Sequence, residues 1–366
     1  MGRYRKTEVA HLKTERRVAR AVAIGGVLIG HSHPIAIQSM TNIYTHDIRA
    51  TVAQIKHLEK AGCEIVRCAV PDDRALKALP EIIRRVRLPV VADIHFRADL
   101  AVAALEAGVP KVRINPGNIG GREPVKRVLR AALDRGASIR IGVNAGSLEP
   151  DILRKHGHPC AAALAESMLR WVEFCESQQF RHLVLSIKST SLRDTIAATR
   201  TIAHATRYPL HIGITEAGTR EYGTVKSALG IGILLLEGIG DTVRVSLAGD
   251  PVPEIAAARM ILKAAGARPF GPEIITCPTC GRTRMDVAAI ARTVEDRTRT
   301  MRGGFTVAVM GCEVNGPGEA READIGVACG RDRAVLFVKG ERIRTIPARR
   351  VVTELMAEIR ARFGDK

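Results

Sequence analysis

Aromatic residues are scarce in this chain: phenylalanine, tyrosine and tryptophan make up 3% of 366 residues, with a single tryptophan, Trp171. Proteins that bind single-stranded nucleic acids stack the bases on aromatic rings, and few such platforms are available here. No zinc-finger, homeodomain or RNP motif is present in the sequence. The composition therefore argues against nucleic acid as the partner, and we expect Trp171 to lie in the core.

Long hydrophobic runs are also missing. The longest apolar stretch, residues 228–236, is interrupted by glycines and is far shorter than the roughly 20 residues that cross a membrane. The N-terminal segment is charged and is not followed by the hydrophobic stretch of a signal peptide. We therefore expect a soluble, cytoplasmic protein with no membrane partner.

Cysteine is too rare for a disulfide framework, with eight residues in the whole chain. Reduced thiols or metal ligation are the expected states at this density. Five cysteines follow no ligand pattern and are interpreted as small buried hydrophobic residues: Cys63, Cys68, Cys160, Cys175 and Cys329.

Acidic residues are outnumbered, with Asp+Glu 38 against Lys+Arg 56 and a formal net charge of +18. The basic residues are spread along the sequence rather than gathered in one tail. Such a distribution is typical of a solvated, Arg-rich surface, whereas a cluster of cations at one site would indicate an anionic small substrate. A basic RNA-binding protein is a third interpretation, which predicts an affinity that falls steeply with salt.

Short β-rich runs alternate with amphipathic helical stretches eight times between residues 34 and 266. The runs are PIAIQSM, CEIVRCAV, LPVVADIHF, KVRINPG, SIRIGVN, HLVLSIK, YPLHIGITEA and DTVRVSL. An uninterrupted series of this kind is what a TIM (β/α)8 barrel requires, and open doubly wound sheets rarely have so many units. We therefore predict a TIM barrel over residues 34–266, preceded at residues 1–33 by a basic lead-in with a short hairpin.

The pattern changes after the predicted barrel. Residues 267–272 form a short linker rich in proline and glycine. Residues 273–366 contain two predicted helices and short strands, and a segment of this length can form a core of its own. We therefore predict a second, small α/β domain at residues 273–366.

The predicted barrel strands carry cations at their C-terminal ends, where TIM-barrel enzymes place their chemistry. Five strands contribute one each: Arg67, Arg113, Arg140, Lys188 and Arg244. A cation within a buried parallel strand is costly unless it is paired or opens onto water. The cations are therefore expected to have partners at this end of the barrel.

Acids available to these cations are few. Asp93 and Glu216 are the two predicted near the same strand ends, and two acids cannot neutralise five cations. The surplus predicts an anion with several charges, and the paired N–H groups of arginine favour a diphosphate. Glu216 is a candidate general acid or base, or a partner of Arg244, and Asp93 is a candidate for orienting a cation. His95 is interpreted as structural.

Three cysteines and one glutamate form the candidate metal site of the second domain. Cys277 and Cys280 make a C-x-x-C motif, and Cys312 follows the β-like run FTVAVMG. A Gly-Pro-Gly turn at residues 316–318 can bring Glu319 back toward the thiols. Such a set suits a 4Fe-4S cluster, in which a carboxylate is a harder and weaker iron ligand than a thiolate and can give way to an oxygen ligand.

Two other uses of these cysteines stay open at this point. Zinc accepts thiolate and carboxylate ligands, although closed structural zinc sites usually have four Cys or His ligands. The C-x-x-C pair could also be a redox dithiol, or the cysteines could be unliganded core residues. The competing class of protein is therefore a TIM-barrel enzyme or binding protein for a phosphate ligand, with a structural zinc module.

Motifs along nearly the whole chain resemble one known family. They are IQSMTN, CEIVRCAVP, VADIHF, RINPGN, RIGVNAGSLE, HIGITEAG, GIGDTVRVSL, CPTCGR and GCEVNGPGEAREADIG. The chain resembles the 4-hydroxy-3-methylbut-2-enyl diphosphate synthases of isoprenoid biosynthesis. The resemblance implies reductive ring opening and dehydroxylation of the cyclic diphosphate of methylerythritol, with two electrons passed from flavodoxin or ferredoxin through a 4Fe-4S cluster.

The resemblance also implies an architecture. Members of the family have a TIM barrel followed by a cluster domain similar to those of sulfite reductases, and the plant-type insertion does not fit this sequence. A head-to-tail homodimer is implied, in which the cluster domain of one chain covers the barrel of its partner. Glu313, next to Cys312, departs from the apolar residue of the family; as a ligand it would have poor geometry.

Site residues carried over from the family fall on the positions already singled out. The cluster ligands are Cys277, Cys280, Cys312 and Glu319. The substrate-binding residues are Arg67, Arg113, Arg140, Lys188 and Arg244, with Asn144 and Ser246 as polar contacts. The barrel acids, Glu216 and less clearly Asp93, are the implied catalytic residues.

Anaerobic purification distinguishes an iron-sulfur protein from a zinc protein. We expect a brown protein with broad visible absorption and about four irons per chain, which is the content of a cubane cluster. Metal analysis and an absorption spectrum of the same sample provide the measurement. A colourless protein with stoichiometric zinc would reject the reductive function.

Overall fold

The chain divides into two structural units, Met1–Ala267 and Arg268–Lys366. The computed structural model describes residues 15–301, 303–312, 318 and 320–364. The sequence predicts four segments, at residues 1–33, 34–266, 267–272 and 273–366. This finer division stays a prediction. Each unit has a sheet of its own, so the two are described separately.

The first unit is built on an eight-stranded sheet in the order β8-β7-β6-β5-β4-β3-β10-β9. The strands are Ala36–Met40 (β3), Ile65–Ala69 (β4), Val90–Ile94 (β5), Lys111–Ile114 (β6), Ser138–Asn144 (β7), Leu183–Lys188 (β8), His211–Ile212 (β9) and Thr242–Val243 (β10). Neighbouring strands pair in parallel, and a bridge between Leu185 and Leu210 joins the two ends of the sheet into a ring. The predicted TIM barrel is confirmed.

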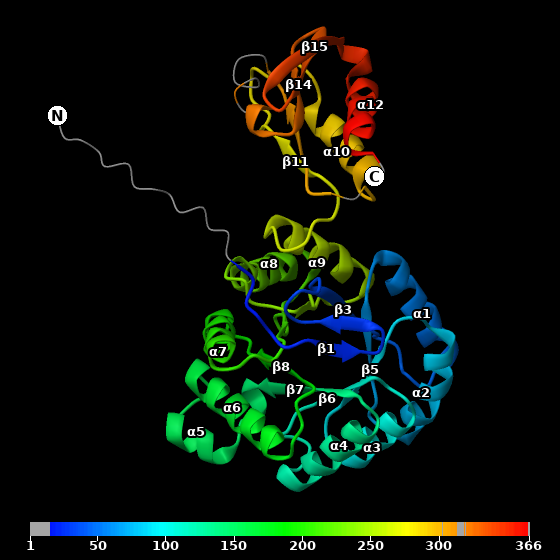
Figure 1. Ribbon diagram of the computed structural model, residues 1–366, viewed down its shortest axis with the longest axis vertical. Helices are drawn as coiled ribbons and strands as arrows, with labels where there is room; N and C mark the ends of the chain where they lie inside the picture. The colour runs from blue at the N-terminus through cyan, green and yellow to red at the C-terminus, as the bar shows by residue number, and fades with distance from the viewer. Residues whose placement is uncertain (1–14, 302, 313–317, 319, 365–366) are drawn as a thin grey trace, which may run out of the picture. The chain divides into compact units, whose positions relative to one another are not determined.

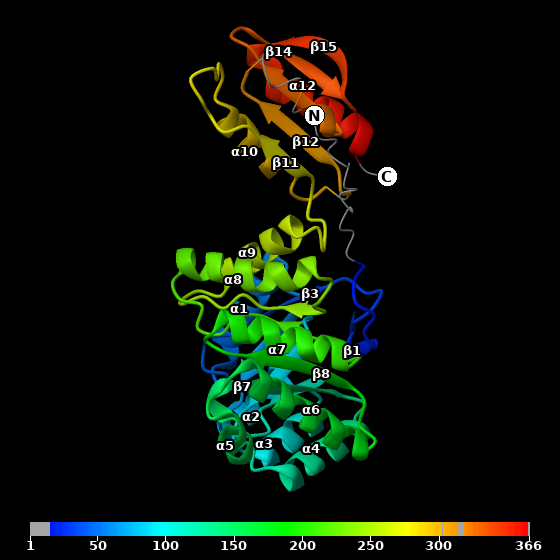
Figure 2. The same cartoon turned by 90° about the vertical axis from the view of Figure 1, so that its left-hand side faces the viewer.

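Helices surround this ring, as Figure 1 and Figure 2 show. They are Ile48–Ala61 (α1), Asp73–Arg85 (α2), Ala98–Glu106 (α3), Arg122–Asp134 (α4), Pro150–His156 (α5), Ala161–Ser177 (α6), Leu192–Ala205 (α7), Arg220–Leu236 (α8) and Val252–Ala264 (α9). In α2 the buried residues are Ala75, Ala78, Leu79 and Ile82, a spacing that places them on one face of the helix. Among the described residues, no helix has the length and apolar composition of a membrane span.

A short hairpin precedes the barrel and packs against the strands. It pairs Val22–Ile24 (β1) with Val27–Ile29 (β2) in antiparallel register. Gly25 adopts a φ of 56° in the turn between them, a conformation that glycine adopts without a steric penalty. Ile24 and Ile29 are fully buried and pack with residues of β3, β4, β5 and β8. The hairpin thus extends the apolar interior of the barrel.

Two strands are shorter than the sequence predicts. The pairing of β9 ends at Ile212 and that of β10 ends at Val243. Glu216 has a φ of 50°, which is left-handed and cannot continue a strand. Glu216, Arg244 and Ser246 therefore lie in the segments that follow these strands rather than within them.

The second unit has a five-stranded sheet in the order β11-β12-β13-β14-β15. Its strands are Glu273–Thr276 (β11), Thr306–Met310 (β12), Ile325–Cys329 (β13), Arg333–Val338 (β14) and Glu341–Pro347 (β15), and its helices are Val287–Thr298 (α10) and Val351–Phe363 (α12). The first three strands are parallel and the last two pairings are antiparallel. This separate α/β unit confirms the second part of the predicted fold.

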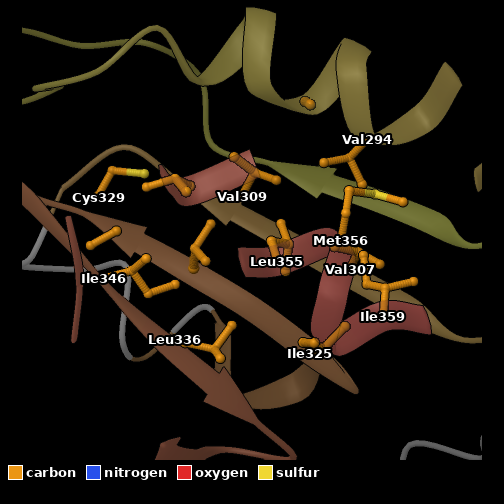
Figure 3. Close-up of a cluster of buried hydrophobic side chains, with 14 of the residues drawn as sticks. Val294, Val307, Val309, Ile325, Cys329, Leu336, Ile346, Leu355, Met356 and Ile359 are labelled. Carbon is orange, nitrogen blue, oxygen red and sulfur yellow. The ribbon is translucent and has the colours of Figure 1, made fainter. Parts of the chain in front are cut away.

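Both helices of the second unit contribute to one apolar core. Val294 of α10 and Leu355 and Ile359 of α12 lie near Val307 and Val309 of β12 in Figure 3. These five side chains are fully buried, which favours folding through the hydrophobic effect. The core holds β11 and β12 side by side, and their C-terminal ends lie at the same edge of the sheet.

Candidate active site

The strand register brings the predicted substrate-binding residues together. Arg113 of β6 lies beside Asp93 of β5 on one side and Arg140 of β7 on the other. Asn144, at the end of β7, lies beside Lys188 of β8. Residues that are 20 or more positions apart in the sequence, such as Asp93 and Arg113, are therefore neighbours at one end of the barrel.

Asp93 is the centre of a buried network of charges. Its side chain is only 4% exposed. Its Oδ1 lies 3.2 Å from Nη1 of Arg113, and its Oδ2 lies 3.6 Å from Nε of Arg67. His95 Nε2 lies 3.5 Å from the same Oδ2. Burial alone raises the pKa of Asp93, but the charge of Arg67 and the other basic neighbours lower it well below its usual range. Asp93 is therefore an ionised carboxylate that orients two arginines.

The two arginines have further contacts that hold their orientation. Arg67 donates from Nη2 to Sδ of Met40 at 2.8 Å. Arg113 Nη1 lies 2.9 Å from His95 Nε2. A Cβ atom at Gly142 of β7 would lie 3.0 Å from Nε of Arg113, closer than real Cβ atoms normally approach. Glycine at this position therefore leaves room for the guanidinium group.

Arg244 pairs with an acid that the sequence analysis missed. Glu254 of α9 is 3% exposed, and its Oε2 lies 3.7 Å from Nε of Arg244. Ser39 Oγ donates to Glu254 Oε2 at 3.0 Å, and the Leu247 N–H donates to Oε1 at 3.0 Å. Burial raises the pKa of Glu254, an effect that Arg244 opposes. The expectation that only two acids lie near these strand ends is therefore wrong.

The spacing of Glu254 relative to apolar residues of α9 could have identified it from the sequence as a buried acid. Ala258 and Ile261 of the same helix are buried with it, and residues four and seven positions apart share one face of a helix. Glu254 therefore belongs to the apolar stripe of α9 rather than to its solvent face. An acid on such a stripe indicates a buried cation as its partner.

Arg140 and Lys188 form no ion pair with an acid among the described residues. Arg140 is 1% exposed, and its Nε and Nη1 have no hydrogen-bond partner among the described residues. Burial, together with Arg67 and Arg113, lowers the pKa of Arg140. Burial is the largest cause that lowers the pKa of Lys188, and the positive charges of Arg244 and Arg140 lower it further. A fully buried lysine on β6, Lys111, was also missed by the sequence analysis. The surplus of cations therefore persists although Glu254 adds a third acid.

The remaining predicted barrel residues lie at or after the C-terminal ends of their strands. Asn144 is partly buried at the C-terminal end of β7, and Ser246 is partly buried two residues after Arg244. Glu216 is exposed, in the segment after β9, and its left-handed backbone is unusual for a residue other than glycine. Such strained residues are frequent at active sites, where the rest of the fold stabilises them.

The cysteines of the second unit lie at one edge of its sheet. Cys277 directly follows β11, and Cys312 follows β12 after Gly311. Thr276 of β11 is in register with Val309 of β12, so both cysteines leave the sheet at the same edge. The N–H of Gly311 donates to Sγ of Cys277 at 3.1 Å. Hydrogen bonds of this kind to sulfur are a feature of iron-sulfur sites.

Cys280 is exposed in the turn after β11. Its N–H donates to Thr283 Oγ1 at 3.0 Å. A hydrogen bond from the Arg282 backbone lowers the pKa of the Cys280 thiol, which favours the thiolate that binds metals. The described residues include no group of three or more His, Cys, Asp or Glu arranged to hold a metal ion. Glu313 and Glu319 lie outside the described residues.

The other cysteines do not belong to either site. None of the eight cysteines forms a disulfide. Cys63, Cys68, Cys175 and Cys329 are buried, as the sequence predicts. Cys160 is only partly buried, because it precedes the first turn of α6, so the expectation of a buried Cys160 is wrong.

A barrel with excess buried cations at its strand ends, joined to a unit with thiols at one sheet edge, defines a TIM-barrel enzyme for an anionic substrate. Comparisons with known proteins make this more specific. The chain belongs to the GcpE family: residues 19–259 match the GcpE TIM-barrel domain, and residues 273–361 match the GcpE protein C-terminal domain. The resemblance seen in the sequence motifs is confirmed.

Curated relatives cover most of the chain. The 4-hydroxy-3-methylbut-2-en-1-yl diphosphate synthase (flavodoxin) of Geobacillus kaustophilus is 51% identical over 344 residues, covering 94% of this chain and 92% of the relative. The enzyme of the same name from Clostridium acetobutylicum is 52% identical over 345 residues, covering 94% of this chain and 99% of the relative.

Solved structures similar to this chain are more distant in sequence. A dihydropteroate synthase from Stenotrophomonas maltophilia has a TM-score of 0.50 and 14% identity, with 68% of this chain and 99% of that chain covered. An N-acetylneuraminic acid synthetase from Leptospira borgpetersenii has a TM-score of 0.51 and 13% identity, with 77% and 97% covered. These identities support a likeness of fold alone.

Replacing Asp93 with asparagine tests its role as the counter-charge of two arginines. We expect Asp93→Asn to lower the free energy of unfolding at pH 7 by about 3 kcal/mol or more, because buried cations lose their partner. Because the folded-state pKa of Asp93 is depressed, its contribution is present above the unfolded-state value and is lost as the pH falls. The difference from the original protein should therefore shrink below about pH 4.

Denaturant unfolding at several pH values provides this measurement. Asp73→Asn is the matched control, because Asp73 forms an exposed ion pair with Arg97, and exposed pairs contribute little to stability. An Asp93→Asn protein as stable at pH 7 as the unmodified protein would show that Asp93 does not hold these arginines.

Proposed function

We propose that this protein converts 2-C-methyl-D-erythritol 2,4-cyclodiphosphate into 4-hydroxy-3-methylbut-2-enyl diphosphate by reductive ring opening and dehydroxylation. The observation that carries this proposal is the surplus of buried cations at the strand ends, which calls for a ligand with several negative charges. Relatives that cover nearly the whole chain are named for the synthesis of this product. The alternative of a barrel with a structural zinc module is not favoured.

The barrel cations are the proposed diphosphate site. The residues that bind the substrate oxygens are Arg67, Arg113, Arg140, Lys188 and Arg244, with Asn144 and Ser246 as uncharged contacts. Guanidinium groups match pairs of phosphate oxygens, and partly desolvated cations bind anions more strongly than cations in water do. Asp93 and Glu254 hold Arg67, Arg113 and Arg244 in place before the substrate arrives.

The thiols of the second unit are the proposed ligands of a 4Fe-4S cluster, one per chain. Cys277, Cys280 and Cys312 would hold it, with Glu319, outside the described residues, as the fourth ligand. The thiol-rich sheet edge and the Gly311 N–H on Cys277 suit this group. When bound, the cluster supplies electrons and an iron that acts as a Lewis acid. The carboxylate ligand would exchange more readily than a thiolate.

Glu216 is the proposed proton donor. Loss of a carbon-bound oxygen as water requires a proton at that oxygen, and a carboxyl group at the strand ends can supply it. Glu216 is exposed in the segment after β9, whereas Asp93 is buried and held as a carboxylate by its arginines. Proton transfer is therefore assigned to Glu216, and the orientation of Arg67 and Arg113 is assigned to Asp93.

Flavodoxin is the proposed electron donor, with ferredoxin as the alternative, because the names of the relatives include flavodoxin.

We also propose a cytoplasmic, head-to-tail homodimer in which the cluster unit of one chain completes the active site in the barrel of its partner. The short linker, residues 267–272, supports this arrangement because it limits how far one cluster unit can reach toward its own barrel.

Turnover with reduced flavodoxin tests the proposed function. Anaerobically prepared, cluster-loaded protein should convert the cyclic diphosphate into the linear allylic diphosphate, detected by phosphorus NMR. Glu319→Ala should keep the fold but lose about 100-fold or more in turnover, because the cluster would lose one of its four protein ligands, and even indirect support of a metal site is worth about 10- to 100-fold in activity. Glu322→Ala, at an exposed position nearby, is the matched control. No product from the original protein would reject the function, and full turnover of Glu319→Ala would remove Glu319 from the site.

Mixed dimers test whether two chains share each active site. Cys312→Ser and Glu216→Gln should each be inactive as homodimers, because one lacks a cluster ligand and the other lacks the proton donor. Free exchange of subunits should restore about a quarter of the original activity, since half of the dimers are mixed and each has one intact site. A mixture that stays inactive, although mass spectrometry shows mixed dimers, would contradict the shared site.

A further inference from the structure

Lys111 is a buried cation that the proposed mechanism does not use. It begins β6, two residues before Arg113, and its side chain is 0% exposed. Residues two apart in a strand share one face, so Lys111 points into the barrel interior, as Arg113 does. Its Nζ has no hydrogen-bond partner among the described residues. A buried amine without a partner is costly, so its presence requires an explanation.

The groups around Lys111 do not neutralise it. Besides Lys111, the charged and titratable side chains of the barrel interior and strand ends include Arg67, Asp93, His95, Arg113, Arg140, Lys188, His211, Glu216, Asp241, Arg244 and Glu254. The buried acids are engaged elsewhere: Asp93 with Arg67 and Arg113, Glu254 with Arg244, and Asp241 with Arg16. Glu216 is exposed. Among the described residues, no carboxylate accepts a hydrogen bond from Lys111 Nζ.

The charged groups that act on Lys111 are themselves basic. The pKa of Lys111 is lowered well below its usual range, mainly by burial and further by the positive charges of Arg140 and Arg67. Arg140, on the adjacent strand β7, also lacks partners at Nε and Nη1. His211 of β9 has a pKa lowered by burial and then by Arg140, Lys188 and Lys111, and its Nε2 lacks a partner too. Lys111 is thus part of a cationic layer beneath the strand ends.

A purely structural role does not account for lysine at this position. A methionine of similar length would fill the same volume without a polar atom, and replacing buried charges by apolar residues of similar volume is often stabilising. The lysine is best explained by a negative charge that is present only part of the time. The proposed diphosphate is such a charge.

We propose that Lys111 is a further anion-binding residue of the barrel, which holds a neutral amine while the barrel is empty and takes up a proton when a phosphate group binds against Arg140. This inference rests on the proposed diphosphate substrate. The bound phosphate lowers the electrostatic cost of charging the amine, so the pKa of Lys111 rises on binding. Binding and proton uptake are therefore linked, and the affinity falls as the pH rises above the pKa of Lys111 in the empty barrel.

Calorimetric titration of the cluster-loaded protein measures this linkage. The cyclic diphosphate, and inorganic diphosphate as a second probe, are titrated in two buffers with different ionisation enthalpies. The original protein should take up about one proton more per ligand than Lys111→Met does, since one amine is removed. Lys111→Met should also bind about 10-fold more weakly or worse, because it loses a charge-assisted interaction.

Thermal unfolding without ligand provides the second readout. Lys111→Met should raise the Tm, because it removes an unpartnered buried amine. The gain should be larger at lower pH, because there the unfolded chain binds a proton at Lys111 that the folded, ligand-free protein does not bind. Lys126→Met is the matched control, because Lys126 is exposed on α4; it should change neither Tm nor proton uptake. Higher stability with weaker binding is the combination that a structural lysine would not produce.

The outcomes separate this inference from the proposed function. If the original protein binds the cyclic diphosphate and Lys111→Met binds it with the same affinity and proton uptake, the inference is overturned while the function stands. Binding by the original protein without any proton uptake overturns it as well, whether or not the variant folds. If the original protein does not bind the cyclic diphosphate at all, the proposed function fails and this inference fails with it.

Discussion

The excess of positive charge inside the barrel is the constraint on which the rest of the site depends. Asp93 forms ion pairs with two arginines, and Glu254 forms an ion pair with Arg244. Arg140 keeps two nitrogen atoms without partners among the described residues. A buried charge without a partner lowers stability, so the protein holds a destabilising arrangement that the proposed anionic ligand would relieve. Removing this electrostatic cost would make the free energy of ligand binding more favourable.

The scaffold explains how such an arrangement can be stable. The ring of parallel strands places one side chain from each of several strands at the same level, and buried aliphatic residues surround them. The hairpin formed by β1 and β2 adds Ile24 and Ile29 to this apolar interior. The hydrophobic effect of the whole barrel outweighs the local cost of the cations, which is the usual relation between a fold and its active site.

The two units supply different chemistry, and the groups around each site suit that chemistry. The barrel gathers nitrogen donors, which bind oxygen anions. The second unit places Cys277 and Cys312 at the ends of adjacent parallel strands, with a backbone N–H directed at the first sulfur. Parallel strands bring their C-terminal ends to one edge, so the same topological rule places the functional residues in both units.

Local patterns in the sequence determined the fold class and most of the candidate site. The alternation of strands and helices predicts a barrel because its period is short and repeated, and the cations stand out because they interrupt apolar strands. The C-x-x-C pair was recognisable because Cys277 and Cys280 are three positions apart in the chain. These features depend on residues only a few positions apart, so they can be read without a structure.

Only the tertiary structure decided which groups neutralise one another. Arg244 pairs with Glu254 from a helix, and Asp93 is shared by two arginines from different strands. Lys111 lies in the same interior, and its Nζ has no hydrogen-bond partner in the part of the chain that the structure describes. Strand register and side-chain direction set these pairings, and neither is encoded by the type of a residue or its immediate neighbours. Charge balance in a barrel depends on distances across the ring, and those distances exist only once the ring has closed.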